Sequence, residues 1–256
     1  MILNSKTYGI RGQDLIIIHG LFGMSDNWVT LGKKFSKHYK VHLIDLRNHG
    51  KSPHSDHFNY DVMCEDVLKY MELHSIYHAI LLGHSLGGKV AMKFAFTYPD
   101  KIAKLIVADI APKNYATDFH KELLLKMSEI DLQNFTKRSE VDNALSLFVD
   151  NIAIRLFLLK NLYRNDSKQF AWRFNTKVLL EQISNIQDAS FLRGICDIST
   201  NFIRGENSDY INTRDEIIIK KHFSDVSIVT INGAGHWLHA EKPEDFYNEV
   251  IEFCLI

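Results

Sequence analysis

A serine between two glycines is the first feature of this sequence that could do chemistry. The segment Gly83–Gly87 reads GHSLG, an apolar run ends at Leu82, and a helical pattern begins at Leu86. This context predicts a sharp strand-to-helix turn with Ser85 at its tip. The free N–H groups at the start of the helix would stabilise negative charge beside the hydroxyl. Ser85 is therefore the predicted nucleophile for attack on a carbonyl carbon, and a glycine-rich turn with a passive serine is the alternative.

A general base for this serine is predicted near the C-terminus. Residues Gly233–Trp237 read GAGHW and place His236 in a glycine-rich loop after a strand pattern. A base on such a loop can approach the serine hydroxyl and orient toward it. His236 and His239 also form a His-x-x-His pair. No glutamate lies inside that spacer and no third ligand is near, so we expect no metal there.

Backbone donors for a developing oxyanion are predicted on a second loop. His19–Gly23 reads HGLFG and follows the first buried strand pattern. Enzymes that transfer acyl groups take one N–H from such a loop and another from the residue after the nucleophile. We therefore expect the oxyanion hole to consist of the N–H groups of Leu21 and Leu86, with Phe22 as the alternative to Leu21. A plain glycine-rich turn is the other interpretation.

The remaining histidines have less telling contexts. Residues 45–52 form a polar turn after a strand pattern, which we interpret as structural, with substrate contact by His49 as the alternative. His84 is expected to pack or hydrogen-bond around the turn that holds the serine. Surface or capping roles are expected for five others: His38, His57, His74, His120 and His222.

The elements that must position these residues alternate in the first part of the chain. Runs that are apolar on both faces are typical of strands in a parallel sheet, and helical patterns between them predict an α/β fold. The expected strands are 14–19, 41–45, 79–83, 104–109, 197–203 and 226–231. The expected core helices are 61–73, with Asp61 as N-cap, 86–96 and 243–253, which has Pro243 in its first turn.

The alternation stops between Lys113 and Ser190. This stretch has no proline or glycine, and its helical patterns lie at 119–130, 141–148 and 152–163. We interpret residues 113–190 as a helical cap or lid inserted into a core formed by 1–112 and 191–256; extra helices of the same core are the alternative. Its aromatic residues are candidates for an acyl pocket: Phe119, Phe148, Phe157, Trp172 and Phe174.

Composition excludes several classes of protein. The 256 residues are 46% hydrophobic and 24% charged, with a net charge of −1, which is ordinary for one globular α/β domain. Without a basic stripe, nucleic-acid binding is not expected. We expect no secretory signal in residues 1–6 and no membrane span. The three cysteines, Cys64, Cys196 and Cys254, are far apart, which favours reduced thiols in a cytoplasmic protein.

Together these motifs resemble the α/β-hydrolase superfamily over nearly the whole chain. The resemblance rests on HGLFG at 19–23, DLRNHGKS at 45–52, GHSLG at 83–87 and GHW at 235–237. Finer strings resemble the small bacterial esterases of the YbfF type, which are similar to abhydrolase-domain esterases of eukaryotes: ADIAP at 108–112, FIRGENS at 202–208 and GHWLHAEKP at 235–243. The resemblance implies carboxylesterase or thioesterase activity without a cofactor.

The carboxylate that would orient the histidine has two candidate positions. In many relatives it follows the penultimate strand, three residues after a glycine, but here the third residue after Gly205 is Ser208. Asp209 and Glu206 flank that position. In the resembled esterases the aspartate of the Asp-Ile-Ala-Pro string is implied, which is Asp109 here. The acid must lie close enough to the imidazole to accept its Nδ1–H, whatever its place in the chain. We therefore predict Asp109 as the acid, with Asp209 as the alternative.

The sequence thus predicts a serine esterase or thioesterase that hydrolyses small-molecule carboxylic esters, acyl-CoA thioesters among them, through an acyl-enzyme. A C–C hydrolase or a menaquinone-pathway lyase of the same fold is an alternative, because both share the serine and the histidine. A binding module without activity is the alternative of another class. The oligomeric state is left open by the sequence.

Overall fold

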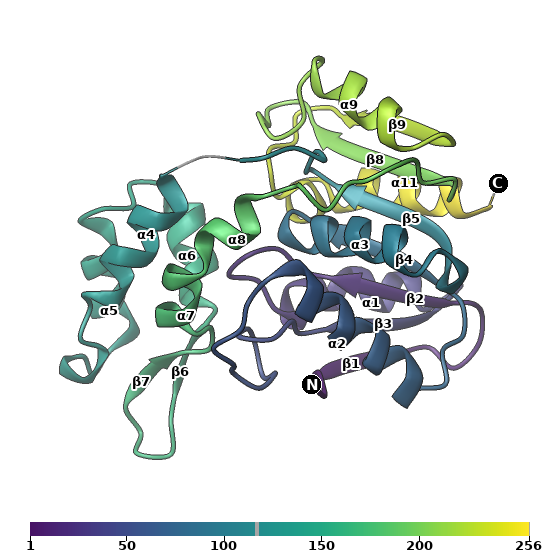
Figure 1. The fold of residues 1–256 in the computed structure, drawn as a ribbon. Helices are drawn as coiled ribbons and strands as arrows, with labels where there is room; N and C mark the ends of the chain where they lie inside the picture. Colours follow the sequence, from purple (N-terminus) through teal and green to yellow (C-terminus); the bar gives the residue numbers. More distant parts are fainter. Residues whose placement is uncertain (116–117, 256) are drawn as a thin grey trace.

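A seven-stranded sheet forms the centre of the computed structural model, which describes residues 1–115 and 118–255 (Figure 1). Its strand order is β1-β3-β2-β4-β5-β8-β9. The strands are β1 Ser5–Tyr8, β2 Asp14–Ile18, β3 Lys40–Ile44, β4 Ala79–His84, β5 Ile102–Ala108, β8 Thr200–Gly205 and β9 Val226–Ile231. Strand β1 pairs antiparallel with β3, and the other neighbours pair in parallel. This sheet confirms the predicted fold class.

Helices cover both faces of the sheet (Figure 1). The core helices are α1 Val29–Phe35, α2 Tyr60–Leu73, α3 Leu86–Thr97, α9 Asp215–His222, α10 Leu238–Glu241 and α11 Pro243–Leu255. Successive residues of a strand point to opposite faces, so Ile16 and Leu15 of β2 belong to different hydrophobic clusters. The first cluster includes residues of α2 and α3, and the second includes residues of α1 and α11.

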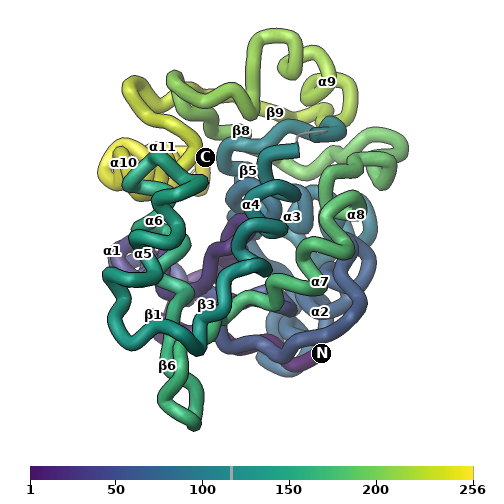
Figure 2. Tube along the Cα trace, turned by 90° about the vertical axis from the view of Figure 1, so that its left-hand side faces the viewer, coloured from purple at the N-terminus to yellow at the C-terminus, as the bar shows by residue number. Residues whose placement is uncertain are grey.

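The predicted cap segment contains five α-helices, one short 3-10 helix at Leu132–Asn134 and a short hairpin within its described residues. The α-helices are α4 Phe119–Ser128, α5 Arg138–Ser146, α6 Ile152–Leu159, α7 Thr176–Glu181 and α8 Ile183–Gln187, with β6 Leu162–Arg164 paired to β7 Phe170–Trp172. Figures 1 and 2 place α4–α7 and the hairpin to one side of the core, beyond the carboxyl ends of the strands. The range predicted for the cap includes residues 116–117, which lie outside the described part. A lid function for this segment remains a prediction.

Several predicted boundaries need correction. The helix predicted at 152–163 ends at Leu159, and residues 162–163 belong to β6. The N-cap of α2 is Asn59, not Asp61, because the Asn59 side chain accepts the N–H of Val62 at 3.0 Å. Strand β1 and helices α1 and α9 had no prediction, since each has few residues and a weak apolar pattern.

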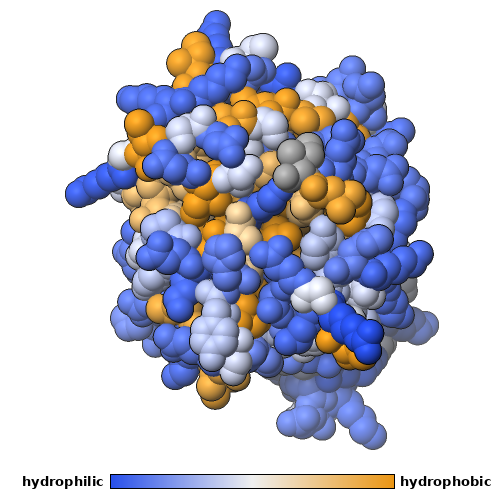
Figure 3. All heavy atoms as spheres, turned by 90° about the vertical axis from the view of Figure 1, so that its right-hand side faces the viewer, coloured by the Kyte–Doolittle hydropathy of each residue, from blue (hydrophilic) through white to orange (hydrophobic). Residues whose placement is uncertain are grey.

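The face that points away from the cap segment is largely hydrophilic, with hydrophobic side chains showing between the polar ones (Figure 3). In the part of the chain that the structure describes, every helix is too short or too polar to cross a membrane.

Candidate active site

Ser85 occupies a strained turn between β4 and α3. Its backbone has φ of 52° and ψ of −117°, a conformation that L-residues rarely adopt. The turn is possible because its flanking glycines allow close approach of neighbouring backbone. A Cβ atom on Gly83 would lie 2.2 Å from the carbonyl oxygen of Gly87, and one on Gly87 would lie 2.3 Å from that of Ile18. These two glycines therefore shape the turn that presents Ser85.

The structure brings His236 together with Asp109. The Nδ1 atom of His236 lies 2.7 Å from Oδ2 of Asp109, whose side chain is fully buried. Asp109 follows β5 directly and also has a positive φ, of 50°. With Nδ1 as the donor to the carboxylate, Nε2 of His236 is left as an acceptor. That is the form of imidazole a general base requires.

Two further donors hold the Asp109 carboxylate. The N–H of Gly205 donates to Oδ1 at 3.1 Å, and the hydroxyl of Ser208 donates to Oδ2. Three donors in total offset the cost of burying the charge. Ser208, the third residue after Gly205, thus supports the acid, a role that was not predicted from the sequence.

The two other candidate acids, Asp209 and Glu206, do not contact His236 in the way that Asp109 does. Asp209 has an exposed side chain, and the carboxylate against His236 is that of Asp109. Glu206, which flanks the same position, accepts the N–H of Gly233 at 2.7 Å, so it anchors the loop that leads to His236. The geometry favours Asp109.

The loop predicted to hold the oxyanion passes directly against the nucleophile. A Cβ atom on Gly20 would lie 2.8 Å from Nδ1 of His84 and 3.2 Å from Cβ of Ser85. The N–H of Phe22 already donates to Nε2 of His49 at 3.2 Å. Leu21 and Phe22 both line the cavity beside Ser85, so it is this bond that disfavours Phe22 as an oxyanion donor and favours Leu21. The pairing of Leu21 with Leu86 remains a prediction.

Two buried histidines shape this loop. His19 accepts the N–H of Leu46 at 3.0 Å, and its Nδ1 lies 2.8 Å from the carbonyl oxygen of Gly20. His49 contacts the carbonyl of Arg47 through Nδ1 and accepts from Phe22 through Nε2. Burial, with His19 nearby, lowers the pKa of His49 to about 3, and burial lowers the pKa of His19 as well. Both rings are neutral scaffolding, which matches the structural interpretation of the 45–52 turn.

Two more histidines support the His236 loop. His84 contacts the carbonyl oxygen of His236 through Nε2 at 2.8 Å, so it hydrogen-bonds near the turn as expected. His239 stacks on Trp28 at 4.1 Å between ring centroids, and burial lowers its pKa to about 3. Within 1–115 and 118–255, no group of three or more His, Cys, Asp or Glu residues could hold a metal ion.

A cavity of about 300 Å³ lies between the core and the cap segment, and Ser85 and His236 both line it. The cap segment contributes mainly apolar and aromatic side chains: Phe119, His120, Leu123, Ile154, Phe157 and Leu158. His120, expected at the surface, is partly buried here; burial and then His236 lower its pKa to about 4. This burial was not predicted from the sequence, because a single histidine contributes no periodic pattern.

Only part of the predicted aromatic lining reaches the cavity. Phe119 and Phe157 line it. Trp172 and Phe174 instead stack on each other at 5.6 Å, and Phe174 packs against Phe22 at 5.2 Å. Phe148 lies with other cap residues beside Leu147 and Lys126. Trp172 therefore packs within the cap segment, and Phe174 packs between that segment and the core.

A mostly parallel sheet with a strained serine turn after its central strand, and a histidine–aspartate pair at the carboxyl edge, defines the architecture of α/β hydrolases. The chain belongs to that family: residues 15–243 match the model of the alpha/beta hydrolase fold.

Relatives with assigned activities cover almost the whole chain. Esterase YbfF of Escherichia coli is 32% identical over 250 residues, 95% of each protein. The sn-1-specific diacylglycerol lipase ABHD11 of Danio rerio is 35% identical and covers 93% of this chain and 77% of its own length. The solved structure of a marine microorganism esterase superposes with a TM-score of 0.95 at 39% identity, over 98% of this chain and 99% of that one. The resemblance to the YbfF type is confirmed.

Proposed function

We propose that this chain is a serine hydrolase that cleaves carboxylic esters through Ser85, His236 and Asp109. The esterase and lipase relatives support a hydrolase that acts on esters. The observation that carries the assignment of residues is the buried 2.7 Å contact between Asp109 and His236, in a cavity that His236 shares with Ser85.

In the first half of the reaction, the Ser85 hydroxyl oxygen attacks the carbonyl carbon while Nε2 of His236 accepts the proton. The N–H groups of Leu21 and Leu86 stabilise the oxyanion, an effect worth about 3–4 kcal/mol per donor in similar sites. The Asp109 carboxylate stabilises the imidazolium without accepting its proton. When the carbonyl re-forms, the bond to the leaving group breaks and His236 protonates the leaving oxygen.

In the second half, water attacks the acyl-enzyme and gives its proton to His236. The tetrahedral intermediate collapses, the bond to Ser85 breaks, and the proton returns to the serine oxygen. The carboxylic acid leaves, and the enzyme is restored. Every proton moves between Ser85, His236, water and the leaving group, so the chain's own residues complete the cycle.

Thioesters would follow the same steps, but three cations of the cap segment already have partners within it, which reduces their support for coenzyme A as leaving group. Arg155 pairs with Asp142 at 2.9 Å, and Lys126 pairs with Glu129. Arg164 donates to the carbonyls of Lys168 and Thr136. Since these charges already have partners, a neutral ester is the favoured substrate class over an acyl-CoA thioester.

The test is a set of initial rates on p-nitrophenyl esters and acyl-CoA thioesters, with a fluorophosphonate probe as label. We expect ester hydrolysis and labelling by the wild type and loss of both in Ser85→Ala. The matched control is Ser139→Ala, which removes an exposed hydroxyl from α5. A wild type that neither labels nor hydrolyses any member would favour a binding module. Labelling without ester hydrolysis would favour C–C or lyase chemistry on the same fold.

A further inference from the structure

A second, much smaller cavity meets the large one at the nucleophile. Its volume is about 50 Å³, and it shares Leu21, Ser85, His120 and Tyr210 with the larger cavity. The scissile carbonyl, held at Ser85, therefore lies where two spaces of very different size join.

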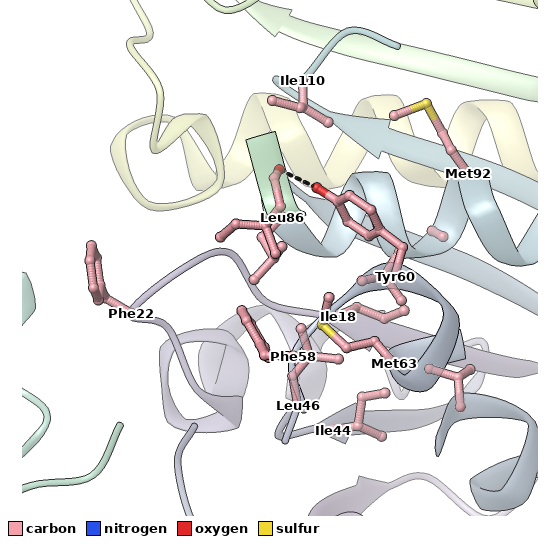
Figure 4. Packing of buried hydrophobic residues seen from close by; sticks show 14 of the residues in the cluster. Ile18, Phe22, Ile44, Leu46, Phe58, Tyr60, Met63, Leu86, Met92 and Ile110 are labelled. Carbon is pink, nitrogen blue, oxygen red and sulfur yellow. Dashed lines mark hydrogen bonds between the residues drawn. The ribbon is translucent and has the colours of Figure 1, made fainter. Parts of the chain in front are cut away.

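The walls of the small cavity are held by internal hydrogen bonds. The Tyr60 hydroxyl donates to the carbonyl of Ile186 at 2.5 Å, and Figure 4 shows Tyr60 with this bond beside Leu86 and Ile110. The Tyr115 hydroxyl donates to the carbonyl of Tyr210 at 2.5 Å and accepts the N–H of Ala111 at 2.7 Å. With both hydroxyls engaged, these walls resist displacement by a longer substrate.

A buried lysine limits how far the small cavity extends along α3. Lys89 lies four residues after Ser85, about 6 Å along the helix axis, and its residue is only 2% exposed. Its Nζ donates to the carbonyls of Gln187 and Asp188 at 3.1 and 3.0 Å, which ties α3 to the end of the cap segment. A long apolar acyl chain that extended from Ser85 along this helix would contact these polar groups.

The position of His236 distinguishes the two arms of an ester. His236 must protonate the leaving oxygen, so the leaving group has to lie on its side of the carbonyl. Among the described residues, His236 lines the large cavity and not the small one. The acyl arm is then directed to the small cavity.

Building on the proposed esterase activity, we propose that this enzyme selects short acyl groups, acetyl or propionyl, on apolar alcohols of medium length. A 150 Å³ cavity holds benzene, so about 50 Å³ accepts about two carbon atoms beyond the carbonyl. By the same measure, about 300 Å³ under the cap segment accepts a leaving group of about a dozen heavy atoms.

Two isomeric esters test this assignment. Hexyl acetate and ethyl hexanoate have the same atoms, and both have simple alcohol leaving groups; they differ in which side of the carbonyl carries the long arm. Followed in a pH-stat, the wild type should show kcat/KM at least about tenfold higher for hexyl acetate, since a pocket penalises excess methylenes by such factors. Equal rates, or preference for ethyl hexanoate, would overturn the inference and leave the esterase proposal standing. No hydrolysis of either isomer would overturn both.

Enlarging the small cavity provides the second arm of the test. Ile186→Ala removes wall atoms while keeping the carbonyl that accepts from Tyr60, and Ile183→Ala serves if that variant does not fold. Either variant should shift the ratio of kcat/KM for ethyl hexanoate to that for hexyl acetate about tenfold toward ethyl hexanoate. The matched control, Leu158→Ala in the large cavity, should leave the preference for the short acyl arm in place. The opposite result would overturn the inference. If Leu158→Ala reverses the preference for hexyl acetate while Ile186→Ala and Ile183→Ala leave it unchanged, the acyl arm lies in the large cavity.

Discussion

At the residue scale, the proposed mechanism depends on a buried carboxylate and on the groups that donate to it. Asp109 accepts hydrogen bonds from His236, Gly205 and Ser208. A side chain with fewer acceptors could occupy the same space and still fail to orient the imidazole. The hydrogen-bonding of residue 109, rather than its size, should therefore control the rate.

Asp109→Asn should lower kcat by about 10⁴, because the amide would stabilise the wrong tautomer of His236. The measurement is the initial rate on a p-nitrophenyl ester, with circular dichroism to check folding. Asp209→Asn, at an exposed position, is the matched control and should keep the wild-type rate. The opposite pattern, a normal Asp109→Asn and an inactive Asp209→Asn, would move the acid to the loop after β8.

At the scale of elements, the site depends on the close approach of α3 to β2. Gly87 lets the first turn of α3 pass over the end of β2, where a Cβ atom would lie 2.3 Å from the Ile18 carbonyl and 2.6 Å from that of His19. Backbone cannot yield as a flexible side chain does, so the helix would have to move away from the strand. The same movement would carry Ser85 away from the loop of residues 19–23, which is predicted to supply an oxyanion donor.

Gly87→Ala should therefore lower the free energy of unfolding by about 1–3 kcal/mol. Urea denaturation of the purified variant measures this. Gly235→Ala is the control, since a Cβ there would come no closer than 3.2 Å to its nearest neighbour, the Glu241 carboxylate, and it should cost distinctly less. Equal costs for the two variants would show that the packing of α3 on β2 is looser than these distances indicate.

At the scale of the whole molecule, several histidines are buried in neutral form around the site. Burial lowers the pKa of His49 and His239 to about 3 and that of His84 well below its ordinary value of 6.5. Below pH 6.5 the unfolded chain therefore binds more protons than the folded one. The stability contributed by these neutral rings is present above pH 6.5 and is lost as the pH falls toward 3.

We expect the free energy of unfolding to decrease steadily between pH 6.5 and 4, by about 1.4 kcal/mol for each unit of pH and each such histidine that protonates on unfolding. Urea titrations at several pH values measure the slope. His239→Phe keeps a ring against Trp28 and removes one titrating group, so its slope should be shallower. His78→Gln, at an exposed position, should retain the wild-type slope. A pH-independent stability would contradict this account.

The sequence by itself determined the fold class and the local conformations around the chemistry. The apolar run before Gly83 and the helical pattern after Ser85 specify a strand-to-helix turn through local periodicity. The buried strands can be predicted because they have apolar residues on both faces. Elements such as β1 and α9 were missed because each is short, so few residues contribute to a periodic pattern.

Only the tertiary structure determined the contacts between residues that are far apart in the sequence. The contact of Asp109 with His236 spans 127 positions, and the bond from Ser208 to Asp109 spans 99. His120 reaches the cavities beside Ser85 through the placement of α4 as a whole, which no local pattern encodes. Periodicity reports on neighbours within a few residues; only packing brings distant side chains into one site.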